Sequence, residues 1–175
     1  MTELSIVPEC YVDTKVAEIL GQATRKYNHQ HGCGDVANQL RNKLKNRIAL
    51  GIIDEDKNKG VVAKYFTEFE TIKEENNLIL KRHRERKHYL ILICPEVEQW
   101  LFTDSKTVGI VLTEFDLPHD LIGLKQITKI QGIDKNMGFY RFIKKLLLAK
   151  APSVTTLQNW IEHFKSDKLD LLLNT

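Results

Sequence analysis

The fold of this chain is decided by the stretch Ile48-Ala49-Leu50-Gly51-Ile52-Ile53, which ends directly at Asp54-Glu55-Asp56. The stretch is about as long as one strand, and none of its side chains is polar. Strands that are buried on both faces occur mainly in parallel sheets covered by helices. The stretch therefore predicts an α/β fold in which Asp54 and Asp56 follow the carboxyl end of a central strand.

Two further apolar stretches predict neighbouring strands. They are Leu4-Ser5-Ile6-Val7 and Tyr89-Leu90-Ile91-Leu92-Ile93-Cys94, and each is stopped by a proline. Acidic residues follow both: Glu9 comes after the first stretch, and Glu96 and Glu98 come after the second. The same pairing of an apolar run with acidic residues thus occurs at three places along the chain.

Helical spacing of apolar residues predicts the connecting elements, and Leu78-Ile79-Leu80 predicts one more short strand. Asp13 falls in the first turn of the first helix, where the helix dipole favours a carboxylate. Asp35 is expected to cap the second helix, and Ser153 or Thr155 the last. The predicted helices span about 12–27, 36–44, 61–69 with a polar end at 73–77, 97–102, 120–130, 137–150 and 154–165.

Strand candidates are confined to the first part of the chain. We therefore expect an α/β domain over residues 1–104 and a helical C-terminal extension over 105–175 that packs on it. The predicted fold class is α/β, with a mostly parallel sheet flanked by helices. A chain of 175 residues is long enough for one such domain with a helical appendage.

The composition excludes several classes of protein. The 26 Lys and Arg against 23 Asp and Glu give a net charge of +3, too slight to indicate a nucleic-acid or membrane surface by itself. The three cysteines are widely spaced and include no C-x-x-C pair, which argues against a disulfide framework and a structural zinc site. No apolar run reaches the ~18–20 residues of a membrane span. We expect a soluble, cytoplasmic protein with no membrane partner.

Acidic residues at successive strand ends point to a metal site. The carboxyl ends of parallel strands share one edge of a sheet, where ligands of open α/β sheets bind. That edge would gather at least four of the carboxylates Glu9, Asp54, Asp56, Glu96 and Glu98. Crowded carboxylates repel one another unless they hold a cation, and Mg²⁺ prefers oxygen ligands. Each acid alone is explained more simply as a loop residue or a helix-terminal carboxylate. Their joint placement favours the metal site.

The same residues resemble the Toprim domain of topoisomerases, primases and OLD-type nucleases. In that domain one apolar strand ends in a glutamate, as in Ile6-Val7-Pro8-Glu9, and a later one ends in D-x-D, as in Ile52-Ile53-Asp54-Glu55-Asp56. Cys94-Pro95-Glu96-Val97-Glu98-Gln99-Trp100-Leu101 resembles the C-P-x-x-E-x-W-L segment of small Toprim-like proteins, including RloB-like proteins of bacterial defence systems. The resemblance covers about residues 4–104.

The resemblance implies a Mg²⁺- or Mn²⁺-dependent site that cuts or joins phosphodiesters. It makes Asp54 and Asp56 metal ligands, Glu9 a metal ligand or general acid/base, and Glu98 the later acidic residue. It also implies defence against phage or plasmids, with a partner ATPase that docks on the C-terminal helices. Cys10 replaces the expected glycine after Glu9, which motivates an alternative: a non-catalytic nucleic-acid- or protein-binding regulatory module that retains the fold. A third possibility is that the acids only cap helices.

One segment is strongly basic. Lys81-Arg82-His83-Arg84-Glu85-Arg86-Lys87-His88 contains five Lys or Arg and two His among its eight residues. Such a cluster can bind phosphates, and the predicted nucleic-acid contacts are Arg82, Arg84, Arg86 and Lys87. A solvated connection that protects a sheet edge explains the segment equally well.

Two other groups carry weaker signals. The spacing of His29-x-His31-x-Cys33 matches no established zinc pattern, so a polar loop is favoured. Phe139-Tyr140-Arg141-Phe142 has the aromatic content to stack on bases, but helix packing explains it with fewer assumptions. Lys144 and Lys145 fit an exposed helix face.

Overall fold

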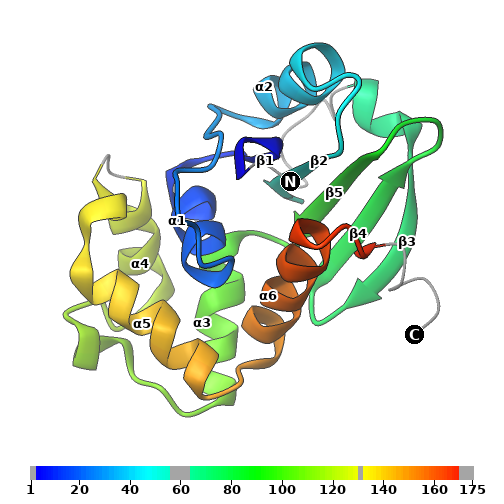
Figure 1. Ribbon diagram of the computed structural model, residues 1–175. Coiled ribbons are helices and arrows are strands. Elements are labelled where there is room, and N and C mark those ends of the chain that lie inside the picture. The colour runs from blue at the N-terminus through cyan, green and yellow to red at the C-terminus, as the bar shows by residue number, and fades with distance from the viewer. Residues whose placement is uncertain (1–2, 56–63, 130–131, 170–175) are drawn as a thin grey trace.

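Figure 1 shows a computed structural model of the chain, which describes residues 3–55, 64–129 and 132–169. Within these ranges the strands form one five-stranded sheet in the order β1-β2-β5-β4-β3. They are β1 (Ile6–Pro8), β2 (Ala49–Asp54), β3 (Phe69–Glu75), β4 (Leu78–His83) and β5 (His88–Ile93). Helices lie against this sheet, so the predicted α/β class is confirmed.

The sheet is mixed rather than mostly parallel. β1 is parallel to β2, and β2 is parallel to β5, so the three apolar stretches point in one direction. β4 pairs antiparallel with both β5 and β3. The expectation of a mostly parallel sheet is therefore corrected, because the chain forms a β-hairpin at one edge of it.

In its described part, the segment 61–69 that we predicted as a helix is a 3₁₀ turn that leads into the hairpin. Residues 61–63 lie outside the described residues, and the described chain then makes a single 3₁₀ turn, Lys64–Glu68, before β3 begins. Asn76 and Asn77 join β3 to β4 with φ angles of 48° and 58°. Two successive positive φ values are typical of a type I′ turn, whose twist matches that of a hairpin. The polar cluster at 73–77 therefore belongs to an edge strand and its turn.

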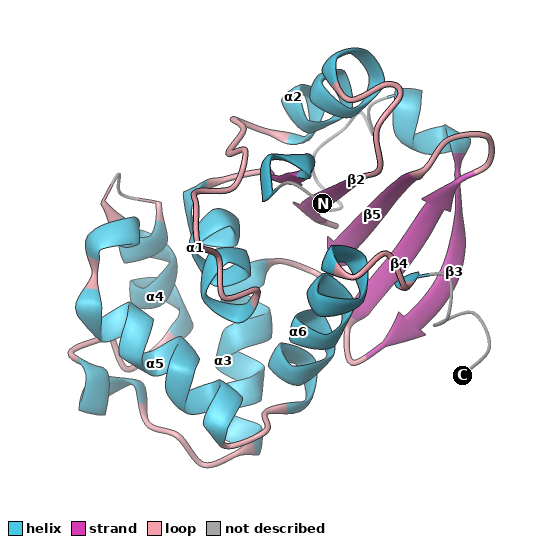
Figure 2. Ribbon diagram, viewed as in Figure 1, coloured by secondary structure: helices cyan, strands magenta, loops and turns pink. Residues whose placement is uncertain are grey.

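The helices lie on both faces of the sheet, as Figure 2 shows. α1, α3 and α6 pack side by side, α5 packs on α1, and α4 packs on α3. α2 and a π-helical turn, Gln39–Lys43, cover the other face. None of the described helices is long and apolar enough to cross a membrane. The helices are α1 (Tyr11–Leu20), α2 (Cys33–Asn38), α3 (Val97–Thr107), α4 (Leu121–Thr128), α5 (Met137–Leu148) and α6 (Pro152–Lys165).

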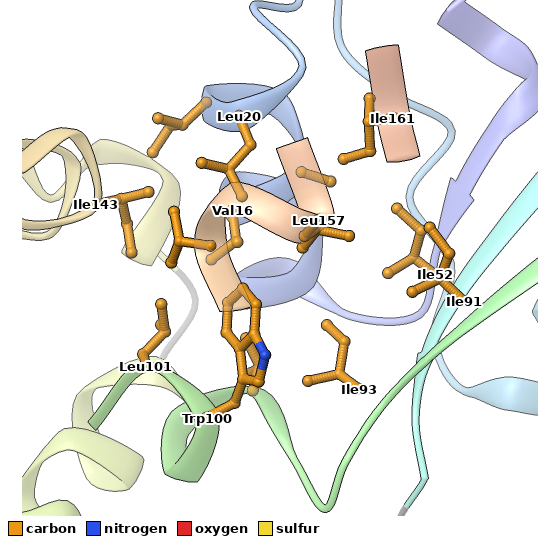
Figure 3. Packing of buried hydrophobic residues seen from close by; sticks show 14 of the residues in the cluster. Val16, Leu20, Ile52, Ile91, Ile93, Trp100, Leu101, Ile143, Leu157 and Ile161 are labelled. Atoms are coloured by element: carbon orange, nitrogen blue, oxygen red, sulfur yellow. The ribbon is translucent and has the colours of Figure 1, made fainter. Parts of the chain in front are cut away.

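The larger hydrophobic core joins the sheet to the C-terminal helices. Figure 3 shows Val16 of α1, Trp100 of α3 and Leu157 of α6 pointing toward one another beside Ile52 and Ile93 of the sheet. All five side chains are almost fully buried. The helices beyond residue 105 thus share one core with the strands.

The smaller core on the other face of the sheet encloses a histidine with hydrogen-bond partners at both ring nitrogens. His88 at the start of β5 is fully buried. Its Nε2 lies 3.0 Å from the carbonyl oxygen of Leu44, and its Nδ1 lies 2.5 Å from the hydroxyl of Tyr65. Because the carbonyl can only accept, Nε2 carries the proton and Nδ1 accepts from Tyr65. The neutral imidazole therefore matches both partners.

This burial predicts a pH-dependent stability. Removal from water lowers the pKa of His88 below its ordinary value, so the unfolded chain binds this proton more readily than the folded one. The free energy of unfolding should then fall as the pH drops below about 6.5, by at most about 1.4 kcal/mol per pH unit, and be unaffected by this group above it. Urea denaturation at about pH 7.5 and pH 5.5 measures the difference. The His88→Gln variant has no titrating ring at this position. Between about pH 7.5 and pH 5.5 its free energy of unfolding should therefore fall by less than that of the wild type. An equal fall in both proteins would contradict the assignment of the pH dependence to His88.

Two predicted helix caps are wrong. α2 begins at Cys33 with Gly32 as its N-cap, so Asp35 lies inside its first turn. The N-cap of α6 is Ala151, and no side chain of its own segment caps it. A carboxylate from α3, Asp104, takes that place and accepts the N–H of Val154 at 2.9 Å.

Candidate functional site

The carboxyl ends of β1 and β2 bring two of the predicted acids together. Glu9 directly follows β1, and its backbone N–H donates to the carbonyl oxygen of Ile52 at 2.9 Å. Its side chain is 3% exposed, and Oε2 accepts the backbone N–H of Asp54 at 3.1 Å. The carboxylate of Glu9 thus contacts the backbone of Asp54, the second acidic residue of this edge.

Asp54 connects this edge to the following helix. Its Oδ1 accepts the backbone N–H of Val97, the first residue of α3, at 3.0 Å. The first N–H groups of a helix have no partner within the helix and favour a negative charge. The N-cap residue itself, Glu96, makes no such side-chain bond, and its carboxylate pairs instead with Lys125 of α4. Asp54 therefore has a structural role alongside any catalytic one.

A further buried acid lies beside this pair. Asp13 in the first turn of α1 is 1% exposed, although a carboxylate placed there for the helix dipole alone would remain in water. Burial raises the pKa of the Cys10 thiol, and the nearby carboxylates of Asp13 and then Asp54 raise it further. A raised pKa keeps the Cys10 thiol protonated at neutral pH, which disfavours a nucleophilic role. The sequence signal for Asp13 is its place in the first turn of the helix that directly follows Glu9.

Of the other two predicted site residues, only Glu98 is among the described residues. Asp56 lies outside the described residues. Glu98 lies on α3, is 6% exposed, and its Oε1 accepts the hydroxyl of Thr128 on α4 at 2.5 Å. Its described contact thus joins two helices.

This contact predicts a measurable loss of stability. Thr128→Val keeps the shape of the side chain but removes the hydroxyl that Glu98 accepts from. A hydrogen bond to a carboxylate contributes about 1.5–3 kcal/mol, so the free energy of unfolding should fall by that amount. Urea denaturation measures it, with Thr103→Val on the exposed side of α3 as the control. Equal stability of the two variants would show that the Glu98 contact contributes nothing.

The acidic residues described at this edge are compatible with magnesium as a site with two carboxylate ligands. Among the described residues, no three His, Cys, Asp or Glu side chains are grouped as a metal site would require. Mg²⁺ is commonly held by one or two carboxylates together with water and substrate phosphates. Glu9 and Asp54 are two carboxylates at one edge of the sheet, where Oε2 of Glu9 lies 3.1 Å from the backbone nitrogen of Asp54.

Comparison with known proteins adds no relative from which a function could be transferred. No family model, curated protein or solved structure matches this chain significantly. The chemistry of the site is therefore inferred from its own residues.

The basic run lies at the opposite end of the sheet from the acids. Arg84 and Lys87 are in the turn between β4 and β5, beside the amino end of β2. Since β2 has six residues at about 3.3 Å each, roughly 17 Å separates its two ends. Arg86 donates to the carbonyl oxygen of Arg41 at 3.2 Å, and Arg82 is half-buried on β4. The four predicted nucleic-acid contacts thus do not border the Glu9–Asp54 edge.

An aromatic cluster lies next to Glu9 instead. The chain returns beside β1, where the N–H of Gln30 donates to the carbonyl oxygen of Pro8 at 3.0 Å. The ring of His29 stacks on Tyr11 at 4.2 Å, with the ring of His31 at 4.8 Å from that of His29. Burial and the neighbouring His31 lower the pKa of His29, which keeps it neutral at pH 7. In the sequence, the only sign of this aromatic cluster was the spacing of His29 and His31, two residues apart.

Proposed function

We propose that the chain cleaves phosphodiester bonds of nucleic acid with a divalent cation, Mg²⁺ or Mn²⁺, held at the Glu9–Asp54 edge. The observation that carries this proposal is the hydrogen bond from the backbone N–H of Asp54 to Oε2 of Glu9, at 3.1 Å. It places two acids, 45 residues apart in sequence, at the carboxyl ends of adjacent parallel strands.

The Toprim-like assignment is part of this proposal. Its support is the arrangement of the elements in space: Glu9 follows β1, the parallel neighbour β2 ends in Asp54, and Asp54 accepts the first N–H of α3, the helix that follows β5. The same resemblance motivates a role in defence against phage or plasmids and a partner ATPase that docks on the C-terminal helices.

The residues of the chain have separate roles in the proposed reaction. Glu9 and Asp54 would hold the cation, with Asp56 as a further ligand. When bound, the cation polarises the phosphoryl oxygen and stabilises the leaving group. Asp54 is oriented by the N-terminus of α3, and Glu9 is oriented by the backbone of Asp54. The buried Asp13 adds negative charge at the same edge and so favours a cation there.

One observation favours a second candidate function. Both carboxylates already accept backbone N–H groups, and that is a sufficient structural reason for each to be present. A regulatory module that binds nucleic acid or protein without cutting it would keep these contacts and the fold. Such a module binds in the presence of EDTA and cleaves nothing.

Cleavage assays separate the two functions. Plasmid DNA and single-stranded RNA are incubated with the protein in Mg²⁺, in Mn²⁺ and in EDTA. We expect cleavage with either metal and none in EDTA, and we expect Asp54→Ala/Asp56→Ala to abolish it. Glu70→Ala/Glu74→Ala removes two exposed carboxylates of β3 and should leave the rate unchanged. Absence of cleavage by wild type, or full cleavage by the Asp54/Asp56 variant, would contradict the proposal.

A further inference from the structure

A pocket of about 510 Å³ lies between α1, the loop that follows it, and α5. Of the described residues that line it, four are cationic, and one, Glu18, is acidic. The carboxylate of Glu18 is hydrogen-bonded to the backbone, since its Oε1 accepts the N–H of Tyr27 at 2.9 Å. The cations are Lys15 from α1, Arg25 and Lys26 from the loop, and Lys144 from α5. The pocket therefore carries a net positive charge.

An aromatic ring lies among these cations. The ammonium of Lys15 is 5.7 Å from the centre of the Tyr140 ring, and that of Lys144 is 5.9 Å from it. Tyr140 is half-buried, so part of its ring faces the pocket while the rest packs on the core. Cations around an aromatic ring are the combination that binds the phosphates and bases of unpaired nucleotides.

The described contacts of the three lysines include no strong ion pair. The ion pair between Lys26 and Asp134 is 3.9 Å long and solvent-exposed, so it is a weak one. The described contacts of Lys15 and Lys144 are to the face of Tyr140, not to a carboxylate. A phosphate would therefore meet at least these two ammonium groups without displacing a strong ion pair.

The pocket is connected to the Glu9–Asp54 edge by one face of α1. Tyr11 and Lys15 are four residues apart, so they lie on the same face about 6 Å apart along the helix axis. Tyr11 stacks on His29 beside Glu9, and Lys15 lines the pocket. Aromatic rings and cations thus follow one another from the acidic edge to the pocket.

We propose that this pocket binds a nucleotide, with its phosphate between Lys15 and Lys144 and its base against Tyr140. The nucleotide can belong to a single strand or be free; the expectation of a strand rests on the proposed function. Phosphate binding here needs no metal and does not use Glu9 or Asp54. If the cleavage proposal failed, the nucleotide pocket could still be correct. If the pocket bound no nucleotide, the cleavage proposal could still be correct.

Binding is tested in EDTA by fluorescence anisotropy with a labelled oligothymidylate of about 12 nucleotides, and by competition with thymidine monophosphate. Lys15→Gln/Lys144→Gln should weaken binding at least about 10-fold and reduce the slope of log affinity against log salt by about 0.7, because both lysines contact the same phosphate. Tyr140→Leu should weaken it on the order of 10-fold through lost stacking. Lys145→Gln/Lys168→Gln removes two exposed charges elsewhere and should change neither quantity.

The outcomes separate the two sources of the nucleotide. Tighter binding of the oligonucleotide than of the mononucleotide, lost in the Lys15/Lys144 variant, assigns a strand; equal binding of both, lost in the same variant, assigns a free nucleotide. Circular dichroism checks that each variant is folded, and Glu9→Gln/Asp54→Asn should retain binding. Lack of binding by wild type, or an equal effect of the Lys145/Lys168 control, would overturn the proposal.

Discussion

Asp54→Asn is expected to lower the rate of metal-dependent cleavage by roughly 10³-fold. The amide retains an Oδ1 that accepts the N–H of Val97, so the start of α3 stays capped. It removes the negative charge that holds the cation, whose stabilisation of the transition state amounts to several kcal/mol, and each ~1.4 kcal/mol is a factor of ten in rate. Single-turnover cleavage at saturating Mg²⁺ measures the change.

The matched control is Asp120→Asn. Asp120 also caps a helix, since its Oδ1 accepts the N–H of Gly123 at 2.7 Å at the start of α4. This variant makes the same chemical change away from the acidic edge and should cleave at the wild-type rate. If a folded Asp54→Asn variant kept more than about a tenth of the activity, Asp54 would be a capping residue only.

Asp104→Ala is expected to lower the free energy of unfolding by about 3–5 kcal/mol. Asp104 on α3 is 2% exposed and holds the start of α6. Its Oδ2 accepts the N–H of Val154 at 2.9 Å, and its Oδ1 accepts the hydroxyl of Ser153 at 2.8 Å. Alanine would leave these donors buried without an acceptor and remove the cap of a helix that packs on α1 and α3.

Urea denaturation of Asp104→Ala and Ser153→Ala separates the cap from the hydroxyl contact. Ser153→Ala removes one of the donors and leaves the carboxylate bonded to Val154, so it should cost only about 1 kcal/mol. A loss below about 1 kcal/mol in Asp104→Ala would show that α6 is held by its apolar face alone.

The strands that build the acidic edge were predictable because each is an apolar run with a clear stop. β1, β2 and β5 are buried on both faces, a pattern that few other elements share. β3 was not predictable from local spacing, since its first residue, Phe69, continues the helical spacing of Tyr65 and Phe66. Its pairing with β4 and the turn at Asn76 and Asn77 decide the outcome, and pairing is a long-range property.

The site was predictable in part for the same reason. The rule for parallel strands places Glu9 and Asp54 at one edge, and they lie there. The rule does not say which way a side chain on the following helix points, so the contact of Glu98 with Thr128 was not foreseen. Nor does local sequence show that the basic run follows an antiparallel strand, which carries Arg84 and Lys87 to the far end of the sheet.

Anomalous diffraction from crystals soaked in Mn²⁺ would locate the cation itself. The proposal predicts one strong peak between Glu9 and Asp54, at about 2.1 Å from a carboxylate oxygen of each, and its loss in crystals of Asp54→Asn. No peak at this edge in the wild-type protein, or a peak that survives in the variant, would contradict a metal-dependent site built on these two residues.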